Sequence, residues 1–237
     1  MSDNIRIKIR LQSNLYIGGA PSAFEIGGID QTTVVDQEGF PYIPASTLKG
    51  AFRNIVHQEQ SENEKKIAKL YRDYIQKMKT DNIALIRNSV EKEELERIEQ
   101  RYEIYLDEDM PLSEYIFGMK GFNNTPKLLF DDFKLSNDFR NVKQCFSIDM
   151  KAEIKNEDNK ILSNPRTYKV ARCGLEFEGM IRFYKIESLS ESANQICRKN
   201  IIANLKKFNE GVYRLGNSKS RGYGRIEVII EEQEGME

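Results

Sequence analysis

The stretch GNSKSRGYG, at residues 216–224, leads directly into an alternating apolar strand at residues 226–230. It holds three glycines within nine residues, so its backbone can adopt positive φ and bring amide groups close to a phosphate. Lys219 and Arg221 add positive charge, and Ser218 and Ser220 add hydroxyl donors. The stretch predicts a loop that holds a nucleic-acid backbone without reading bases, although a tight structural turn has the same composition.

A second motif, PYIPASTLKGAFR at residues 41–53, predicts the start of a helix. Ser46 or Thr47 can cap this helix after Pro44, and the following apolar residues recur at helical spacing. A helix N-terminus offers unpaired amides to an anion, and Lys49 and Arg53, four residues apart, share one face. The motif is a second candidate for phosphate contacts, and a capped helix with exposed basic residues is the alternative.

The remaining pattern predicts one fold class. Strands are expected where apolar and polar residues alternate, and a helix is expected at residues 190–208. The expected strands lie at residues 5–11, 127–135, 146–155, 175–186 and 226–230. The order strand, helix, strands, helix, strand is that of a split βαβ unit. The sequence therefore predicts an α+β fold with a ferredoxin-like, RRM-like core.

Residues 58–106 differ from the rest of the chain in pattern and charge. Apolar residues recur there at helical spacing, which predicts two amphipathic helices in a hairpin that breaks near residues 81–82 or 88–89. Residues 59–109 hold 10 basic and 14 acidic side chains, and residues 231–237 hold four acidic ones. The rest of the chain has 26 basic and 19 acidic residues, a balance that suits a polyanion such as nucleic acid.

Several kinds of protein are excluded or disfavoured. Cys145, Cys173 and Cys197 lie far apart and His57 is the sole histidine, so no zinc site is expected, and a cleavage mechanism with two imidazoles is excluded. No apolar run is long enough to span a bilayer, and residues 1–10 do not form a secretory signal peptide. We expect a cytoplasmic protein that makes no contact with a membrane.

The two motifs together resemble those of the RAMP (repeat-associated mysterious protein) superfamily, namely its PxIPGSSLKGxxR helix start and its GGxxSRGYG loop. Phe117-Gly118 followed by residues 128–132, LLFDD, resembles the family's segment between these motifs. Asn164-Pro165-Arg166 is similar to a stretch in the thumb hairpin of the Csm-type backbone subunit. Residues 17–19, 26–30 and 34–36 are similar to a loop of that subunit, and the resemblance covers most of the chain outside residues 59–109.

The resemblance implies a single RAMP domain over residues 1–237, with a helical insertion at about 59–109 and a thumb β-hairpin at about 148–173. It implies a backbone subunit of a type III CRISPR effector complex, which acts in antiviral defence. The expected partners are guide RNA, complementary target RNA, copies of the chain in a filament, and other subunits of the complex. The implied RNA-binding residues are Ser46, Lys49, Arg53, Arg166, Asn217, Ser218, Lys219, Ser220 and Arg221.

The resemblance also implies an endoribonuclease that cuts the bound target with a loop aspartate, Asp30, and a divalent metal, with magnesium expected. A carboxylate beside a splayed nucleotide can hold a metal against the scissile phosphate or help the 2′-hydroxyl to attack. The metal's other ligands are unknown. Without the resemblance, the preferred interpretation of Asp30 is a turn residue after Gly27-Gly28. The chain departs from the family at Tyr16, where related subunits often carry a histidine that contacts the guide.

Two other functions stay open. The chain can be a non-catalytic RAMP subunit that binds guide RNA and spaces or caps the filament. It can also be an endonuclease that processes the guide precursor, but the histidine of such enzymes is hard to place, because His57 lies at a predicted helix end.

Overall fold

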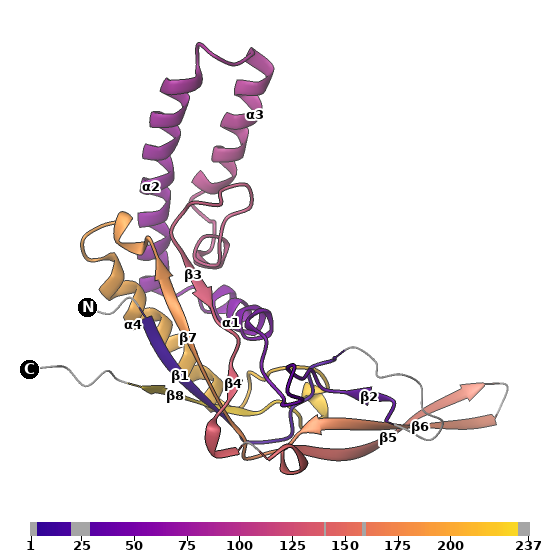
Figure 1. Ribbon diagram of the computed structural model, residues 1–237. Coiled ribbons are helices and arrows are strands. Elements are labelled where there is room, and N and C mark those ends of the chain that lie inside the picture. The colour runs from indigo at the N-terminus through magenta and orange to yellow at the C-terminus, as the bar shows by residue number, and fades with distance from the viewer. Residues whose placement is uncertain (1–3, 20–28, 140, 158–159, 232–237) are drawn as a thin grey trace, which may run out of the picture. The chain divides into compact units, whose positions relative to one another are not determined.

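The structure of the chain is a computed structural model that describes residues 4–19, 29–139, 141–157 and 160–231, with only the backbone described for 153–157 and 160–164. Figure 1 shows the elements along the chain. The helices are α1 (Ala45–Glu59), α2 (Glu62–Ile86), α3 (Lys92–Glu103) and α4 (Ala193–Lys206). The strands are β1 (Asn4–Leu11), β2 (Gln31–Thr32), β3 (Lys127–Phe130), β4 (Lys134–Leu135), β5 (Phe146–Glu157), β6 (Lys160–Ala171), β7 (Glu176–Tyr184) and β8 (Ile226–Glu231).

The chain divides into two compact units. We call the first the helical unit, which comprises Met1–Asn4, Phe52–Leu129 and Ile181–Asn204. We call the second the thumb unit, which comprises Ile5–Ala51, Phe130–Met180 and Leu205–Glu237. The expectation of one domain over residues 1–237 stays a prediction.

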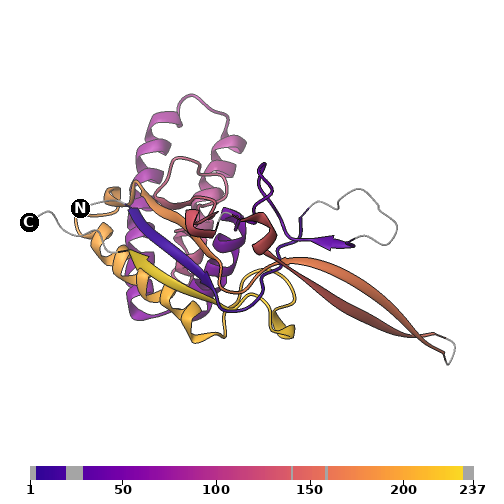
Figure 2. The same ribbon diagram turned by 60° about the horizontal axis from the view of Figure 1, so that its bottom comes forward.

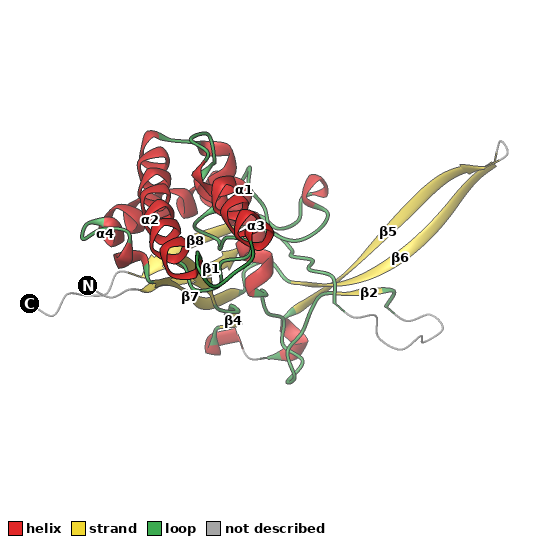
Figure 3. Cartoon of the chain, turned by 90° about the horizontal axis from the view of Figure 1, so that it is seen from above, coloured by secondary structure: helices red, strands yellow, loops and turns green. Residues whose placement is uncertain are grey.

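The larger sheet has the strand order β3-β7-β1-β8, with β4 also paired to β7. When β1, β3, β7 and β8 are counted in chain order, the third and first strands lie in the middle of the sheet, as in the ferredoxin-like arrangement. Helices precede β3 and β8, so the expected order of strands and helices is present. The prediction of an α+β fold is confirmed (Figure 3).

Strand β1 forms because its side chains alternate between a buried and an exposed face. Ile5, Ile7 and Ile9 are at most 1% exposed, and β1 pairs antiparallel with β8 over six residue pairs. Two cations of the other face lie against carboxylates: Lys8 pairs with Glu176 and Glu178, and Arg10 pairs with Glu176 and Glu227. The charges of Lys8 and Arg10 are therefore balanced within the thumb unit.

The strand expected at residues 127–135 is wrong in one respect, because the chain leaves the sheet between β3 and β4. Phe133 is fully buried, and its backbone N–H and C=O bond to Ile43 instead of to the sheet. A side chain at Gly179 on β7 would lie 2.8 Å from the Phe133 ring, so Gly179 leaves the space that this ring fills. Burial of one large ring thus divides the predicted strand into two.

The smaller sheet has the order β2-β6-β5. Strands β5 and β6 pair antiparallel along their whole length, from Phe146↔Ala171 to Glu157↔Lys160, and Figure 2 shows them side by side as a long ribbon. This hairpin lies where the thumb was expected. Strand β2 is short and runs parallel to β6, with Gln31 opposite Tyr168.

In the helical unit, α2 and α3 form the expected hairpin, which breaks at residues 87–91, at the second of the two predicted positions. Aromatic side chains fill the base of the hairpin. Tyr71 on α2 is fully buried and stacks on Tyr115, with ring centroids 5.3 Å apart. No helix in the described part of the chain is both long enough and apolar enough to cross a membrane.

The start of α2 is fixed by a buried polar contact. Ser61 and Glu64 form a capping box, in which the Ser61 hydroxyl accepts from the Glu64 amide and the Glu64 carboxylate accepts from the Ser61 amide. Glu64 is only 2% exposed, and its other oxygen accepts a 2.7 Å hydrogen bond from the Asn204 amide group on α4. The carboxylate therefore satisfies donors from two helices of the helical unit.

We expect Glu64→Ala to lower the free energy of unfolding by about 2 kcal/mol, because it removes a helix cap and leaves the buried Asn204 amide without its acceptor. Glu62→Ala, one residue into the same helix turn, removes only an exposed ion pair with Lys65 and should leave stability unchanged. Urea unfolding followed by circular dichroism measures both. Equal stability of the two variants would contradict the role assigned to Glu64.

Candidate nucleic-acid interface

The glycine-rich loop is built on left-handed backbone. Gly216, Gly222 and Gly224 have positive φ, and so does Ser218, at +58°. Residues 219–221 form a single 3-10 turn between Ser218 and Gly222. The side chains of Asn217, Lys219, Ser220 and Arg221 are exposed, and that of Ser218 is half-buried. The backbone conformation therefore turns a run of polar and basic side chains outward.

This loop docks on the segment that follows β1. The Asn217 amide donates to the Tyr16 carbonyl at 2.7 Å, and the Gly224 amide donates to the Asn14 carbonyl at 2.9 Å. A side chain at Gly216 would lie 2.3 Å from the Tyr16 carbonyl oxygen, and one at Gly224 would lie 1.9 Å from the Leu215 carbonyl oxygen. Glycine is required at both places because the backbones approach too closely for a Cβ atom.

The base of the β5–β6 hairpin lies against the same loop. Asp149 and Lys151 on β5 are paired in register with Tyr168 and Arg166 on β6, so the four residues share one face. The Lys151 ammonium lies 3.3 Å from the Ser218 hydroxyl. The sequence patterns place Arg166 and the loop in separate motifs, and the fold brings the hairpin face that carries Arg166 to the loop.

Asp30 lies along the edge of β6. Its amide donates to the Thr167 carbonyl at 3.0 Å, and its carboxylate oxygen Oδ2 accepts from the Thr167 amide at 2.7 Å. The next residue, Gln31, accepts a 2.6 Å hydrogen bond from the Tyr16 hydroxyl, and Tyr16 packs edge-on against Tyr168. Asp30 is exposed. The preceding part of this motif, residues 26–28, lies outside the described residues.

Asp30, the face that carries Arg166, and residues 217–221 are thus joined through one cluster in the thumb unit. The cluster contains Tyr16, Lys151, Tyr168 and Tyr223. Tyr223 lies within the glycine-rich motif, and Tyr16 is the position at which the chain departs from the family. Lys151 and Tyr168 belong to no motif, and alternation within the hairpin, which puts Asp149 and Lys151 on one face and Ile148 and Met150 on the other, is the sequence signal for Lys151.

Burial sets the protonation of this cluster. It raises the pKa of the Tyr223 hydroxyl, and the hydrogen bond to Asp149 raises that pKa further. Burial also raises the pKa of Tyr16. It lowers the pKa of the Lys151 ammonium; Arg221 lowers that pKa further, and Asp149 acts in the opposite direction. The two tyrosines therefore remain hydrogen-bond donors at neutral pH.

At the start of α1, where phosphate contacts were expected, several backbone amides already bond to acceptors of the chain itself. The Ala45 amide donates to the Asp132 carboxylate at 2.7 Å, and the amides of Thr47 and Leu48 bond to the Pro44 carbonyl. These three amides are therefore not available to an external anion. Ser46 is exposed and Lys49 is half-buried, and their contact with RNA stays a prediction.

Arg53 and His57 belong to the helical unit. The Arg53 guanidinium binds both carboxylate oxygens of Glu114, at 2.7 and 2.6 Å. His57 lies 3.1 Å from the Ser113 hydroxyl through its Nδ1 atom. Both side chains thus have local partners on the segment that follows α3, and contact of Arg53 with RNA stays a prediction.

Metal-binding side chains are sparse. Within the described ranges, no group of three or more histidine, cysteine, aspartate or glutamate side chains is placed to hold a metal ion. Cys145 and Cys197 are buried free thiols, and burial raises the pKa of Cys197 to about 12.

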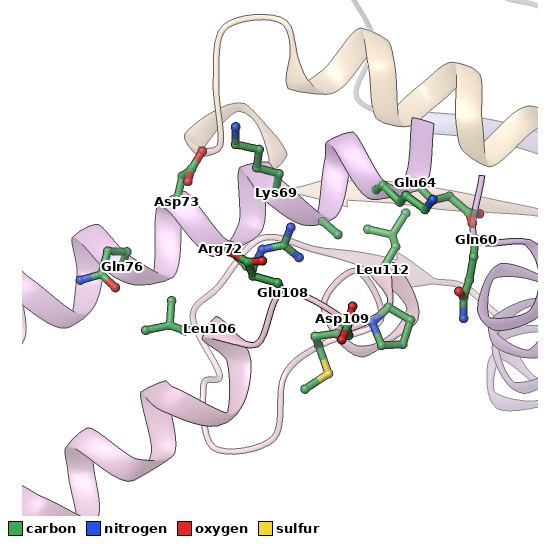
Figure 4. Close-up of a pocket in the computed structure, with 14 residues that line it drawn as sticks. Gln60, Glu64, Lys69, Arg72, Asp73, Gln76, Leu106, Glu108, Asp109 and Leu112 are labelled. Carbon is green, nitrogen blue, oxygen red and sulfur yellow. The ribbon is translucent and has the colours of Figure 1, made fainter. Parts of the chain in front are cut away.

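A pocket of about 730 Å³ lies between α2 and residues 106–112 in the helical unit (Figure 4). Its wall carries both signs of charge: Lys69 and Arg72 come from α2, and Glu108 and Asp109 come from the facing segment. None of the predicted RNA-binding residues lines this pocket. Its mixed charge does not favour a polyanion.

The close approach of the glycine-rich loop gives a stability test. We expect Gly222→Ala to lower the free energy of unfolding by about 1 kcal/mol, because its backbone is left-handed but nothing lies within 4 Å of the added Cβ. Gly224→Ala should lower it by about 3 kcal/mol, because the same strain is joined by a clash with the Leu215 carbonyl. Denaturant unfolding of both variants measures the difference, and equal decreases would refute the close approach of the Leu215 carbonyl to Gly224.

Comparisons with known proteins show the family and the fold of the chain. A family model described as the RAMP superfamily matches residues 8–227. The fold is similar to that of a chain in a cryo-EM structure titled as the Type III-B Cmr-beta bound to cognate target RNA, with a TM-score of 0.50 and 18% sequence identity. That likeness covers 97% of this chain but 60% of the other, so this chain spans less than two thirds of the solved one.

A comparison with curated protein sequences gives no match. The family model nevertheless spans both motifs, the sheet and the hairpin, from β1 to β8. This chain therefore belongs to the RAMP superfamily.

Proposed function

We propose that the chain is a guide-RNA-binding backbone subunit of a type III CRISPR effector complex, acting in the cytoplasm. The observation that carries the proposal is the meeting of the glycine-rich loop, the Asp30 segment and the thumb base in one compact unit. The similar solved chain belongs to a complex that its title describes as bound to target RNA. The proposed partners are guide RNA, target RNA, further copies of the chain and other subunits of the complex.

The arrangement suits binding to a sugar–phosphate backbone. Left-handed backbone at Gly216, Ser218 and Gly222 exposes the loop, and Lys219 and Arg221 form no ion pair with any described residue. Phosphate contacts of this kind position a strand without reading its bases. Such a subunit can bind any guide sequence.

This proposal predicts a strong dependence of affinity on salt. We expect the double variant Lys219→Ala with Arg221→Ala to bind a labelled single-stranded RNA more weakly. The slope of log affinity against log salt should become less negative by about 0.7 for each phosphate that is no longer neutralised. Lys92→Ala with Arg97→Ala removes two exposed charges from α3 and serves as the control. Fluorescence anisotropy measures the slopes. A wild-type chain that binds no RNA, or equal slopes in the two double variants, would reject the proposed interface.

We further propose that Asp30 cleaves the bound target RNA together with magnesium. Its Oδ2 atom is held by the Thr167 amide, and its Oδ1 atom accepts no hydrogen bond from the described residues. One free carboxylate oxygen fits Mg²⁺, which proteins usually bind through one or two carboxylates, water and substrate phosphates. When bound, the ion supplies positive charge at the scissile phosphate. Asp30 would hold the ion through its carboxylate, and the hydrogen bonds to Thr167 on β6 fix the position of Asp30.

We expect target cleavage by the assembled complex to be abolished by Asp30→Asn and by Asp30→Ala, and by chelation of magnesium. The asparagine variant is the sharper test, because its amide oxygen can still accept from the Thr167 amide while the negative charge is removed. RNA binding should be retained in Asp30→Asn. Regularly spaced cuts that persist in this variant would show that Asp30 has no catalytic role.

One observation favours a second candidate, a non-catalytic RAMP subunit. Asp30 bonds to Thr167 through both its amide and its carboxylate, which is also what a residue that fixes a loop to a strand would do. Guide and target binding without cleavage in the wild-type complex would support this candidate.

A further inference from the structure

Lys151 has an unusual environment at the base of the thumb. Its ammonium nitrogen lies 3.8 Å from the centre of the Tyr223 ring and 4.5 Å from the centre of the Tyr168 ring. A third contact, at 3.3 Å, is with the Ser218 hydroxyl. The residue thus touches both parts of the interface, the hairpin and the glycine-rich loop, and its side chain is half-buried between them.

Among the described residues, Lys151 forms no ion pair. The nearest acidic side chain that affects it is Asp149, two residues earlier on the same face of β5. That carboxylate already accepts hydrogen bonds from the Tyr223 hydroxyl and the Asn14 amide group. Two further charged neighbours are cations. Arg221 lowers the pKa of Lys151, and Arg166 is the register partner of Lys151 on β6.

Burial of an ammonium without an ion pair opposes folding, and its contacts with the two rings and the Ser218 hydroxyl act in the other direction. Because burial lowers its pKa, the folded chain binds this proton less tightly than the unfolded chain does. The unfavourable contribution is therefore present at neutral pH, and it disappears only as the pH rises through the folded pKa towards the unfolded one.

We propose that Lys151 binds a phosphodiester of the RNA that passes between the glycine-rich loop and the thumb base. The ring cage fixes the position of the ammonium, and an ammonium has three donors, of which Ser218 engages one. Ser218 is itself held in left-handed backbone beside Lys219 and Arg221. A phosphate oxygen there would meet three cations from two different elements. This inference rests on the proposed RNA-binding function.

The test is the salt dependence of binding to a labelled single-stranded RNA by the full-length chain. Lys151→Met should make the slope of log affinity against log salt less negative by about 0.7, the value for one phosphate contact on a single strand. Lys151→Arg keeps the charge and should retain the wild-type slope. Neither variant should lower the melting temperature, because Lys151 forms no ion pair with a described residue that either substitution could break.

The control is Lys169→Met. Lys169 also lies over a ring, with its ammonium 4.1 Å from the centre of Phe146, but it occupies the opposite face of the same hairpin. The substitution removes the same charge from a matched environment, and its slope should equal that of the wild type.

A slope unchanged in Lys151→Met, with wild-type RNA binding intact, would overturn this inference and leave the proposed function standing. Failure of the wild-type chain to bind RNA would overturn the proposed function itself. A measurement on the wild type covers the case in which Lys151→Met does not fold. Bound RNA should protect the Lys151 amine, but not that of Lys169, from acetylation detected by mass spectrometry, and equal labelling of Lys151 with and without RNA would refute the contact.

Discussion

Two backbone hydrogen bonds hold the interface together. The amides of Asn217 and Gly224 donate to the carbonyls of Tyr16 and Asn14, so both ends of the glycine-rich loop are fixed to the segment after β1. Glycine at position 216 is a consequence of that approach, since a Cβ atom there would overlap the Tyr16 carbonyl oxygen, whereas glycine at position 224 makes room for the Leu215 carbonyl. Because Tyr16 also contacts Gln31 and Tyr168, fixing the loop fixes its relation to the Asp30 segment and to the thumb base.

Two groups of cationic side chains in the thumb unit differ in their partners. On β1, Lys8 and Arg10 face glutamates of the neighbouring strands, and their charges contribute to the sheet. In the glycine-rich loop, Lys219 and Arg221 form no ion pair with any described residue. Counts of basic and acidic residues cannot separate these two groups, because the difference lies in which side chains the fold brings together.

The sequence predicts the main elements well, because local patterns determine them. Alternation in β1, helical spacing in α2 and α3, and the glycines of the loop all report preferences that act within a few residues. The division of β3 from β4 could not be predicted, because it depends on Phe133 filling the space over Gly179, far away in the sequence. The Asp132 contact with the first amide of α1 and the cage around Lys151 are likewise products of tertiary packing.

The hairpin formed by α2 and α3 starts with its own cap and has an exposed turn between its two helices. Ser61 and Glu64 secure α2 at its base, whereas Arg87, Asn88 and Ser89 at the far end are exposed. Exposed tips of this kind accept added residues readily. An affinity tag or a fluorophore placed at Asn88 would thus leave every residue of the thumb unit as it is. The turn of this hairpin is therefore a suitable attachment point for purifying the protein together with its binding partners, and for following assembly by single-molecule fluorescence.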